Sequence, residues 1–134
     1  MPNDLVTPEN LSTELLKSMF DAAFMETSID EDGDLQVRDG IGCYVFARED
    51  RIRLMTLFRS KEGASRQELL EFANRVNDEY VIVRVTISNK GTVSFDYDIP
   101  VKGGITKQAV VLATKRFLSI PINAIAEYGS TLIR

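Results

Sequence analysis

Three segments of the chain carry apolar residues at the spacing of an amphipathic helix, and all three predict helices. They are residues 7–26, 60–77 and 105–118. The first begins at Thr7, a favourable capping residue. Pro8 follows at the first helical position, where its missing N–H is not needed. Pro121 is expected to kink or end the third helix, because proline cannot donate the hydrogen bond of a helix interior.

The second and third helices also carry start signals in the sequence. Ser65 and Glu68 form the Ser-x-x-Glu pattern of a capping box, in which each side chain bonds to the other's backbone. Thr106 is placed to cap the third helix, with Ile105 and Val110 flanking it at the spacing of a hydrophobic staple. The starts of these two helices are therefore predicted more sharply than their ends.

Three strand-like segments lie between the first two helices, and they predict an antiparallel meander. They are LQVR (35–38), IGCYVFAR (41–48) and RIRLMTLFR (51–59). Asp-Gly at positions 39–40 is a strong two-residue hairpin signal, and it would place Leu35 opposite Tyr44. A second turn at positions 49–50 would place Tyr44 opposite Met55 and Phe46 opposite Arg53.

These registers predict a sheet with two largely apolar faces. One face would carry Leu35, Val37, Tyr44, Phe46, Met55 and Leu57, with Arg53 as its charged exception. The other would carry Cys43, Val45, Ala47, Ile52, Leu54 and Phe58. A two-layer protein normally has one polar sheet face, so the second face should be covered by a helix or by another chain. The candidate partner or dimer surface is thus Leu35, Val37, Tyr44, Phe46, Arg53, Met55 and Leu57.

A second hairpin is predicted from YVIVRVTIS (80–88) and TVSFDYDI (92–99). A three-residue loop, 89–91, pairs Ile87 with Val93 and gives Gly91 the left-handed position of a bulge. The same register places Arg84 opposite Asp96, as a cross-strand ion pair. The predicted order is α-β-β-β-α-β-β-α, an antiparallel sheet of the α+β class. We expect a single domain over residues 1–134, with its core at about 8–128.

Composition excludes several classes of function. The chain has 134 residues with 44% apolar residues, no histidine and one cysteine. Without histidine it lacks the commonest general base, and a structural zinc site is excluded within one chain. The net charge of −4 disfavours nucleic acid as a partner. No secretory signal and no apolar run of about 18 residues is evident, so we expect a cytoplasmic protein that does not bind membranes.

Two local signals suggest chemistry, but both are better explained by structure. SIDEDGDLQV (28–37) spaces aspartates like a calcium loop, yet its sixth position is Leu35 and its twelfth is Ile41. A turn through Gly33 is the simpler interpretation. Cys43 lies between apolar neighbours and has no histidine to activate it, so we expect a buried inert thiol. We predict no catalytic residue, no metal and no cofactor.

The chain resembles the YbjN family, whose members are described as bacterial sensory transduction regulators. ASRQELLEFANRVN, VIVRVTISNKGTVSFDYDIPVKGGIT and AVVLATKRFL carry the resemblance, together with DEDGDLQV and LFRSKEGAS in the N-terminal half. The asparagines at 74 and 77 and the DYDIP segment are the most distinctive features. The family in turn resembles class I type III secretion chaperones, which are small acidic homodimers that bind extended segments of other proteins. The resemblance implies no catalysis.

The favoured function is a non-enzymatic protein-binding module, regulatory or chaperone-like, that acts as a homodimer. One alternative is a small-molecule sensor or enzyme with a pocket between helices and sheet, using Arg53, Arg84, Asp96 and Asp98. Another is nucleic-acid binding through the basic residues clustered between positions 48 and 66. The simpler interpretation of that cluster is a solvent-exposed strand edge, where charged side chains prevent pairing with the edge of another sheet.

Overall fold

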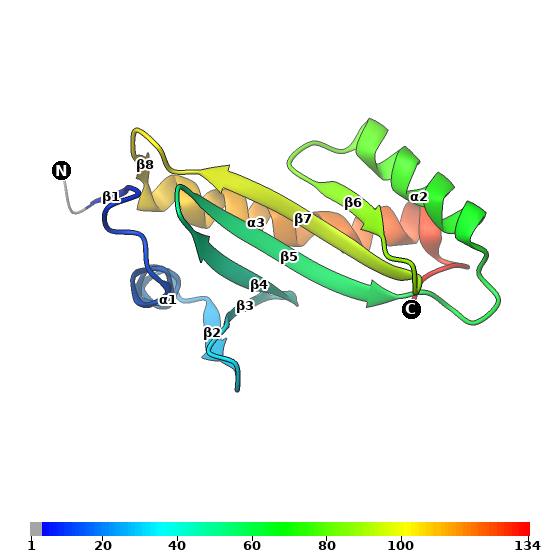
Figure 1. Cartoon of the computed structure of the whole chain (residues 1–134), viewed down its shortest axis with the longest axis horizontal. Coiled ribbons are helices and arrows are strands. Elements are labelled where there is room, and N and C mark those ends of the chain that lie inside the picture. Colours follow the sequence, from blue (N-terminus) through cyan, green and yellow to red (C-terminus); the bar gives the residue numbers. More distant parts are fainter. Residues whose placement is uncertain (1–3) are drawn as a thin grey trace.

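The computed structural model describes residues 4–134 and shows one antiparallel sheet with helices on one side (Figure 1). Its elements are β1 (Leu5–Val6), α1 (Thr13–Ala22), β2 (Glu26–Ile29), β3 (Leu35–Asp39), β4 (Ile41–Arg48), β5 (Arg51–Arg59), α2 (Arg66–Glu79), β6 (Arg84–Ile87), β7 (Thr92–Pro100), β8 (Ile105–Thr106), α3 (Lys107–Ala124) and a π-helical turn (Ile125–Gly129). Six strands form the main sheet in the order β2-β3-β4-β5-β7-β6, and β1 pairs only with β8. The predicted α+β class is confirmed, with β2 and the β1–β8 pair as additions to the predicted order.

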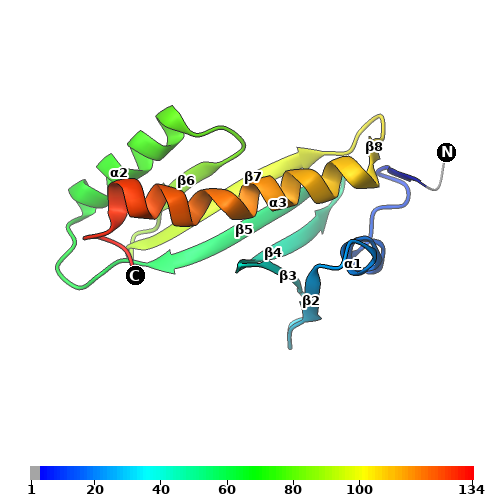
Figure 2. The ribbon, with the colours of Figure 1, turned by 180° about the vertical axis from the view of Figure 1, so that it is seen from behind.

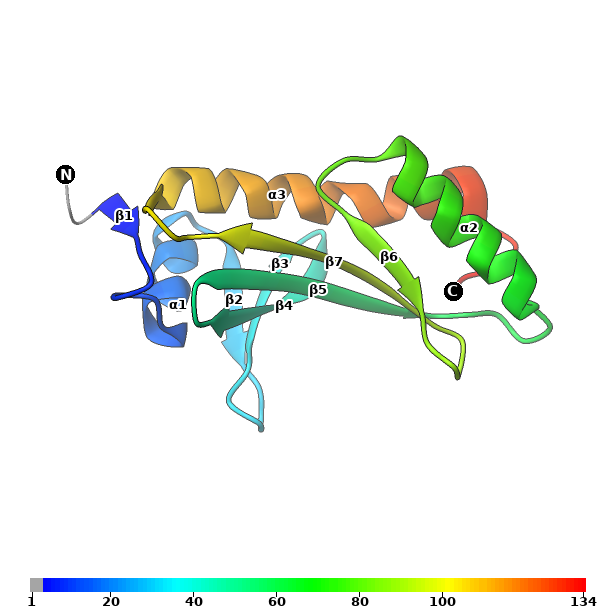
Figure 3. The same cartoon turned by 45° about the horizontal axis from the view of Figure 1, so that its top comes forward.

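The helices all lie on one face of the sheet. In Figure 2 the long helix α3 runs across this face, with α1 towards one end and α2 beside β6 at the other. Figure 3 shows α3 above the strands and the β2–β3 hairpin projecting away from the helices. We call the helix-covered side the core face and the opposite side the outer face. No described element crosses the outer face.

The first helix is shorter than predicted at both ends. Its cap is Ser12, whose side chain accepts a hydrogen bond from the Leu15 N–H at 3.1 Å. Thr7 instead forms a separate turn with Asn10, in which the Thr7 N–H donates to Asn10 Oδ1 at 2.8 Å. The predicted start at residue 7 was wrong because a capping residue followed by proline also suits such a turn.

A Schellman motif ends α1 well before residue 26. The Met25 N–H donates to the Phe20 carbonyl and the Phe24 N–H donates to the Asp21 carbonyl, both at 3.0 Å. Buried Met25 and Phe20 supply the apolar contact that usually accompanies this motif. The position that glycine normally occupies is taken by Phe24, at φ +62°. A left-handed backbone costs an L-residue about 1–2 kcal/mol.

The β3–β4 register differs from the prediction by one residue. Leu35 lies opposite Val45, and Asp39 lies opposite Ile41 across Gly40. Only Gly40 has positive φ in this turn, so the two-residue turn expected at 39–40 does not form. A one-residue slip moves every side chain of a strand to the other face. Leu35 and Val37 are therefore fully buried on the core face, and their place on the predicted partner surface was wrong.

The other two predicted registers are confirmed. Tyr44 lies opposite Met55 in the β4–β5 pair, and Ile87 lies opposite Val93 in the β6–β7 pair. Gly91 takes the expected positive φ of +84°. The longest ladder joins β5 to β7, which are separated in sequence by α2 and β6. That pairing had no local signal.

Helix α2 has the predicted capping box. The Glu68 N–H donates to Ser65 Oγ and the Ser65 N–H donates to Glu68 Oε1, each at 3.1 Å. In α3, Thr106 accepts from the Ala109 N–H at 3.1 Å, also as predicted. Pro121 does not end this helix, which continues to Ala124 and then widens into the π-helical turn.

Helix α3 is the longest helix and runs across the core face. With the turn that follows, the segment Lys107–Gly129 is long and apolar enough to cross a membrane by length and composition alone. The sequence prediction missed this because charged residues interrupt the segment. Residues such as Val110, Phe117 and Ile120 are buried, and 39% of the apolar window is buried inside the protein.

Candidate protein-binding face

Tyr44 and Phe46 form an apolar patch on the outer face. Their rings stack with centroids 5.8 Å apart and planes 9° from parallel. The guanidinium of Arg48 lies 4.6 Å from the Phe46 ring centroid, a cation–π contact. Met55 extends the patch from the neighbouring strand, directly opposite Tyr44. All of these side chains remain partly or fully accessible to solvent.

A shallow depression of about 290 Å³ borders the patch. Gly42 lines it, and the Arg38 guanidinium lies against the position where a side chain at Gly42 would begin. Leu57 lines it and is 48% exposed, although the preceding residue, Thr56, is buried. The remaining lining residues are Gln36, Arg38, Cys43, Tyr44, Met55 and Thr56. Its size suits one side chain of a partner better than a free ligand, because ligand pockets are typically 300–1,000 Å³ and enclosed.

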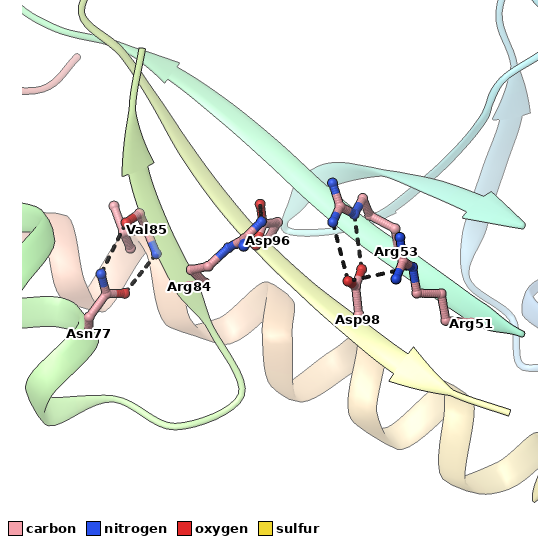
Figure 4. A network of polar contacts seen from close by, with 7 residues as sticks. All are labelled: Arg51, Arg53, Asn77, Arg84, Val85, Asp96 and Asp98. Carbon is pink, nitrogen blue, oxygen red and sulfur yellow. Dashed lines mark hydrogen bonds and ion pairs between the residues drawn. The ribbon is translucent and has the colours of Figure 1, made fainter. Parts of the chain in front are cut away.

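Arginine–aspartate pairs continue the outer face beyond the patch (Figure 4). Arg53 binds Asp98 through two hydrogen bonds, of 3.0 and 3.2 Å. Arg84 binds Asp96 in the same way, at 2.9 and 3.0 Å, as its predicted position implied. Arg51 lies 3.7 Å from Asp98 as a further ion-pair partner. Bidentate geometry makes these pairs more specific than ordinary surface ion pairs.

The pairing shifts the pKa values of Asp98, Arg53 and Arg84 in the direction that keeps these three groups charged. Hydrogen bonds from Arg53 lower the pKa of Asp98 below its ordinary value of 3.8, against the opposing effect of burial. The bond to Asp98 likewise raises the pKa of Arg53, and the bond to Asp96 raises that of Arg84. These groups are consequently fixed charges near neutral pH. They do not form the acid and base of a catalytic pair.

The sensor hypothesis placed Arg53, Arg84, Asp96 and Asp98 in a pocket between helices and sheet. The structure places all four on the outer face instead, where the register carries them to the side away from α3. The predicted basic cluster is also divided. Arg48 stacks on Phe46, and Arg66 donates to the Ser88 carbonyl at 2.8 Å.

Asn77 closes one edge of the sheet. Its side chain accepts from the Val85 N–H at 2.7 Å and donates to the Val85 carbonyl at 3.0 Å (Figure 4). The amide thereby occupies the position that a further strand would take beside β6. Asn77, singled out in the sequence for its distinctiveness, thus has a structural task. Asn74 is exposed on the same helix.

The aspartates of the β2–β3 turn lie together, with carboxylate oxygens of Asp30, Asp32 and Asp34 within 4.8 Å of one another. Asp30 Oδ1 accepts from the backbone N–H groups of Asp32 and Asp34, at 3.0 and 2.9 Å. This is the hydrogen bonding of an Asx turn, which explains the spacing of the acids without a metal.

Cys43 is buried on the core face, as predicted. Burial raises the pKa of its thiol to about 12. The thiol therefore remains protonated at physiological pH, and a protonated thiol is a poor nucleophile.

The site residues predicted from the sequence divide into two groups. Tyr44, Phe46, Arg53, Met55 and Leu57 come together on the outer face, whereas Leu35 and Val37 lie in the core. Sequence reasoning missed three contributors, which are Gln36, Gly42 and Arg48. The correct β3–β4 register would have found Gln36, because it lies opposite Tyr44.

Comparison with known proteins identifies the family. A sequence profile described as "YbjN: Putative bacterial sensory transduction regulator" matches residues 12–125, most of the chain. The protein therefore belongs to the YbjN family. Its fold is shared by a solved structure described as "Crystal structure of YbjN, a putative transcription regulator from E. coli", with a TM-score of 0.76 and 12% sequence identity over 92% of this chain and 95% of that one. A search of curated proteins finds no match.

Proposed function

We propose that this protein is a non-enzymatic regulatory module of the cytoplasm that acts by binding protein, as a homodimer, through its outer face. The observation that carries the proposal is the partly exposed apolar patch of Tyr44, Phe46 and Met55, on the sheet face that none of the described helices covers. Patches of this kind on soluble proteins usually mark interaction sites. Membership of a family described as regulators supports the regulatory part.

The charges around the patch suit burial against a partner. Arg53 and Arg84 already bind Asp98 and Asp96, so covering them would not leave an unpaired charge. Aromatic residues and arginine are also the types enriched at the centres of interfaces. With each of the six strands taken at its own length, the outer face covers roughly 600 Å². A stable interface needs about 800 Å² on each partner, so the outer face would supply most of that area.

Sedimentation velocity on matched variants tests the proposal. Met55→Arg introduces a charge at the centre of the patch, and Leu112→Glu makes a comparable change at a residue of α3 that is 57% exposed and far from the outer face. We expect the wild type and Leu112→Glu to sediment as dimers at micromolar concentration, and Met55→Arg as a monomer. A monomeric wild type, or a dimer that Met55→Arg leaves intact, would refute dimerisation through this face.

A further inference from the structure

The sheet has a second open feature, the free edge of β2. β2 pairs only with β3, and the Asp30 N–H donates to the Asp34 carbonyl at the end of that ladder. Hydrogen bonding alternates along an antiparallel pair, so Ser28 faces β3 while the backbone groups of Thr27 and Ile29 point away from the sheet. In the described part of the chain no other strand takes these groups, in contrast to the edge that Asn77 closes.

Phe24 lies immediately before this edge, and the fold does not explain why phenylalanine stands there. Its side chain is 97% exposed, the highest value among the large apolar residues that the structure describes. The Schellman motif requires the left-handed backbone at this position, φ +62°, but glycine would adopt it without strain. Residues kept at a cost in stability gather at binding sites. A bulky aromatic ring held in water at a glycine position is therefore best explained as an anchor for a partner.

Charge selects the kind of partner. The β2–β3 hairpin, residues 26–39, contains six acidic residues and Arg38, a net charge of −5, so the rest of the chain is close to neutral. A second copy pairing along β2 would bring two such hairpins together, and like charges would repel. A basic segment would instead be attracted along the whole edge.

We propose that the free edge of β2 accepts an extended basic segment of another protein as a seventh strand, with Phe24 contacting an apolar side chain of that segment. Main-chain hydrogen bonds to Thr27 and Ile29 would supply affinity, and the acidic hairpin would supply selectivity, as in other cases of strand addition. The inference deepens the proposed protein-binding function, but it uses a surface separate from the outer face.

A random dodecapeptide library displayed on phage tests this proposal, with the selected peptides remeasured by fluorescence anisotropy. Phe24→Gly removes the anchor and relieves the backbone, and Ile29→Pro removes an outward N–H. Leu112→Ala is the control for loss of an exposed apolar side chain. We expect the selected peptides to alternate basic and apolar residues. They should bind both edge variants at least about tenfold more weakly than the wild type, and they should bind Leu112→Ala as tightly as the wild type. Chemical denaturation of each variant separates lost binding from lost folding.

Four results would overturn the proposal. Three concern the peptides: none is selected, the selected peptides are acidic, or they bind the edge variants as tightly as the wild type. The fourth is a dimer that dissociates on Phe24→Gly, which would identify a second copy as the occupant. Met55→Arg tests the outer face separately. If that variant is monomeric yet binds the peptides normally, both proposals stand. If the wild type dimerises through the outer face but no peptide binds the β2 edge, only the strand-addition proposal fails.

Discussion

The sheet has a closed side and an open side, and both are visible within one strand. Ile52 and Leu54 of β5 are completely buried, while Met55 and Leu57 on alternate positions lie on the outer face. The edges differ in the same way. Asn77 caps the backbone of β6, whereas no residue among 4–134 caps β2 in this way. The described chain therefore concentrates its packing on one side and leaves the other open.

The largest expected effect concerns the two faces. Leu54→Ala should lower the free energy of unfolding by about 2–5 kcal/mol, because it leaves a cavity at a fully buried position. Met55→Ala, one residue away, should cost less than Leu54→Ala in the monomer, since the Met55 side chain on the outer face is only partly buried. Urea unfolding at low protein concentration measures both. Equal losses for the two variants would mean that the outer face is part of the packed core.

The closed edge should show the next largest effect. Asn77→Ala leaves the Val85 N–H and carbonyl without their partner, which should cost about 1–3 kcal/mol. Asn74→Ala, on the exposed side of the same helix, should change stability by less than about 0.5 kcal/mol. Hydrogen exchange of the Val85 amide adds a local measure, and it should accelerate only in the Asn77 variant. Unchanged exchange would show that water replaces the side chain at no cost.

A substitution beside the open edge of β2 should raise the free energy of unfolding, whereas the substitution at the closed edge lowers it. Phe24→Gly removes an exposed side chain and relieves the left-handed backbone at φ +62°, so the free energy of unfolding should rise by up to about 1 kcal/mol. Thermal unfolding would detect this as a small increase in Tm. A clear loss of stability would show that Phe24 supports the fold, and its assignment as an anchor would then fail.

The smallest effect is the pH dependence of stability that comes from the arginine–aspartate pairs of the outer face. The folded-state pKa of Asp98 lies below 3.8, so this carboxylate stabilises the fold above pH 3.8, and its contribution is lost as the pH falls through the lowered pKa. Because the side chain is 35% exposed, we expect less than about 1 kcal/mol. Asp98→Asn should therefore be slightly less stable than the wild type at pH 7, and the difference should shrink as the pH falls below 3.8 through the lowered pKa. A difference that stays constant as the pH falls below 3.8 would contradict the pairing with Arg53.

Local sequence signals predicted the parts of the fold that local interactions determine. Capping chemistry located the starts of α2 and α3, and loop parity fixed the β4–β5 and β6–β7 registers. The β3–β4 register was decided by the burial of Leu35 and Val37, which outweighed the preference of Asp-Gly for a two-residue turn. β2 is short and polar, so it owes its pairing to β3 and gives no signal of its own.

The candidate site was predictable only in part for the same reason. Tyr44, Phe46, Arg53, Met55 and Leu57 were found because the β4–β5 register was correct. The bond between Arg53 and Asp98 depends on the β5–β7 ladder, which joins residues 45 positions apart. The exposure of Phe24 was hidden for a different reason, since the apolar pattern predicted a first helix that extends to residue 26 and so includes Phe24.

The most direct test of the outer face as a binding surface is the solvent accessibility of the Met55 methyl group in the intact protein. A soluble paramagnetic probe, with NMR detection of labelled methionine methyls, compares Met55 with buried Met19 over a range of protein concentrations. We predict that Met55 is accessible in dilute solution and becomes protected in step with dimer formation, while Met19 stays protected throughout. A Met55 methyl that remains accessible after dimers have formed would contradict the account.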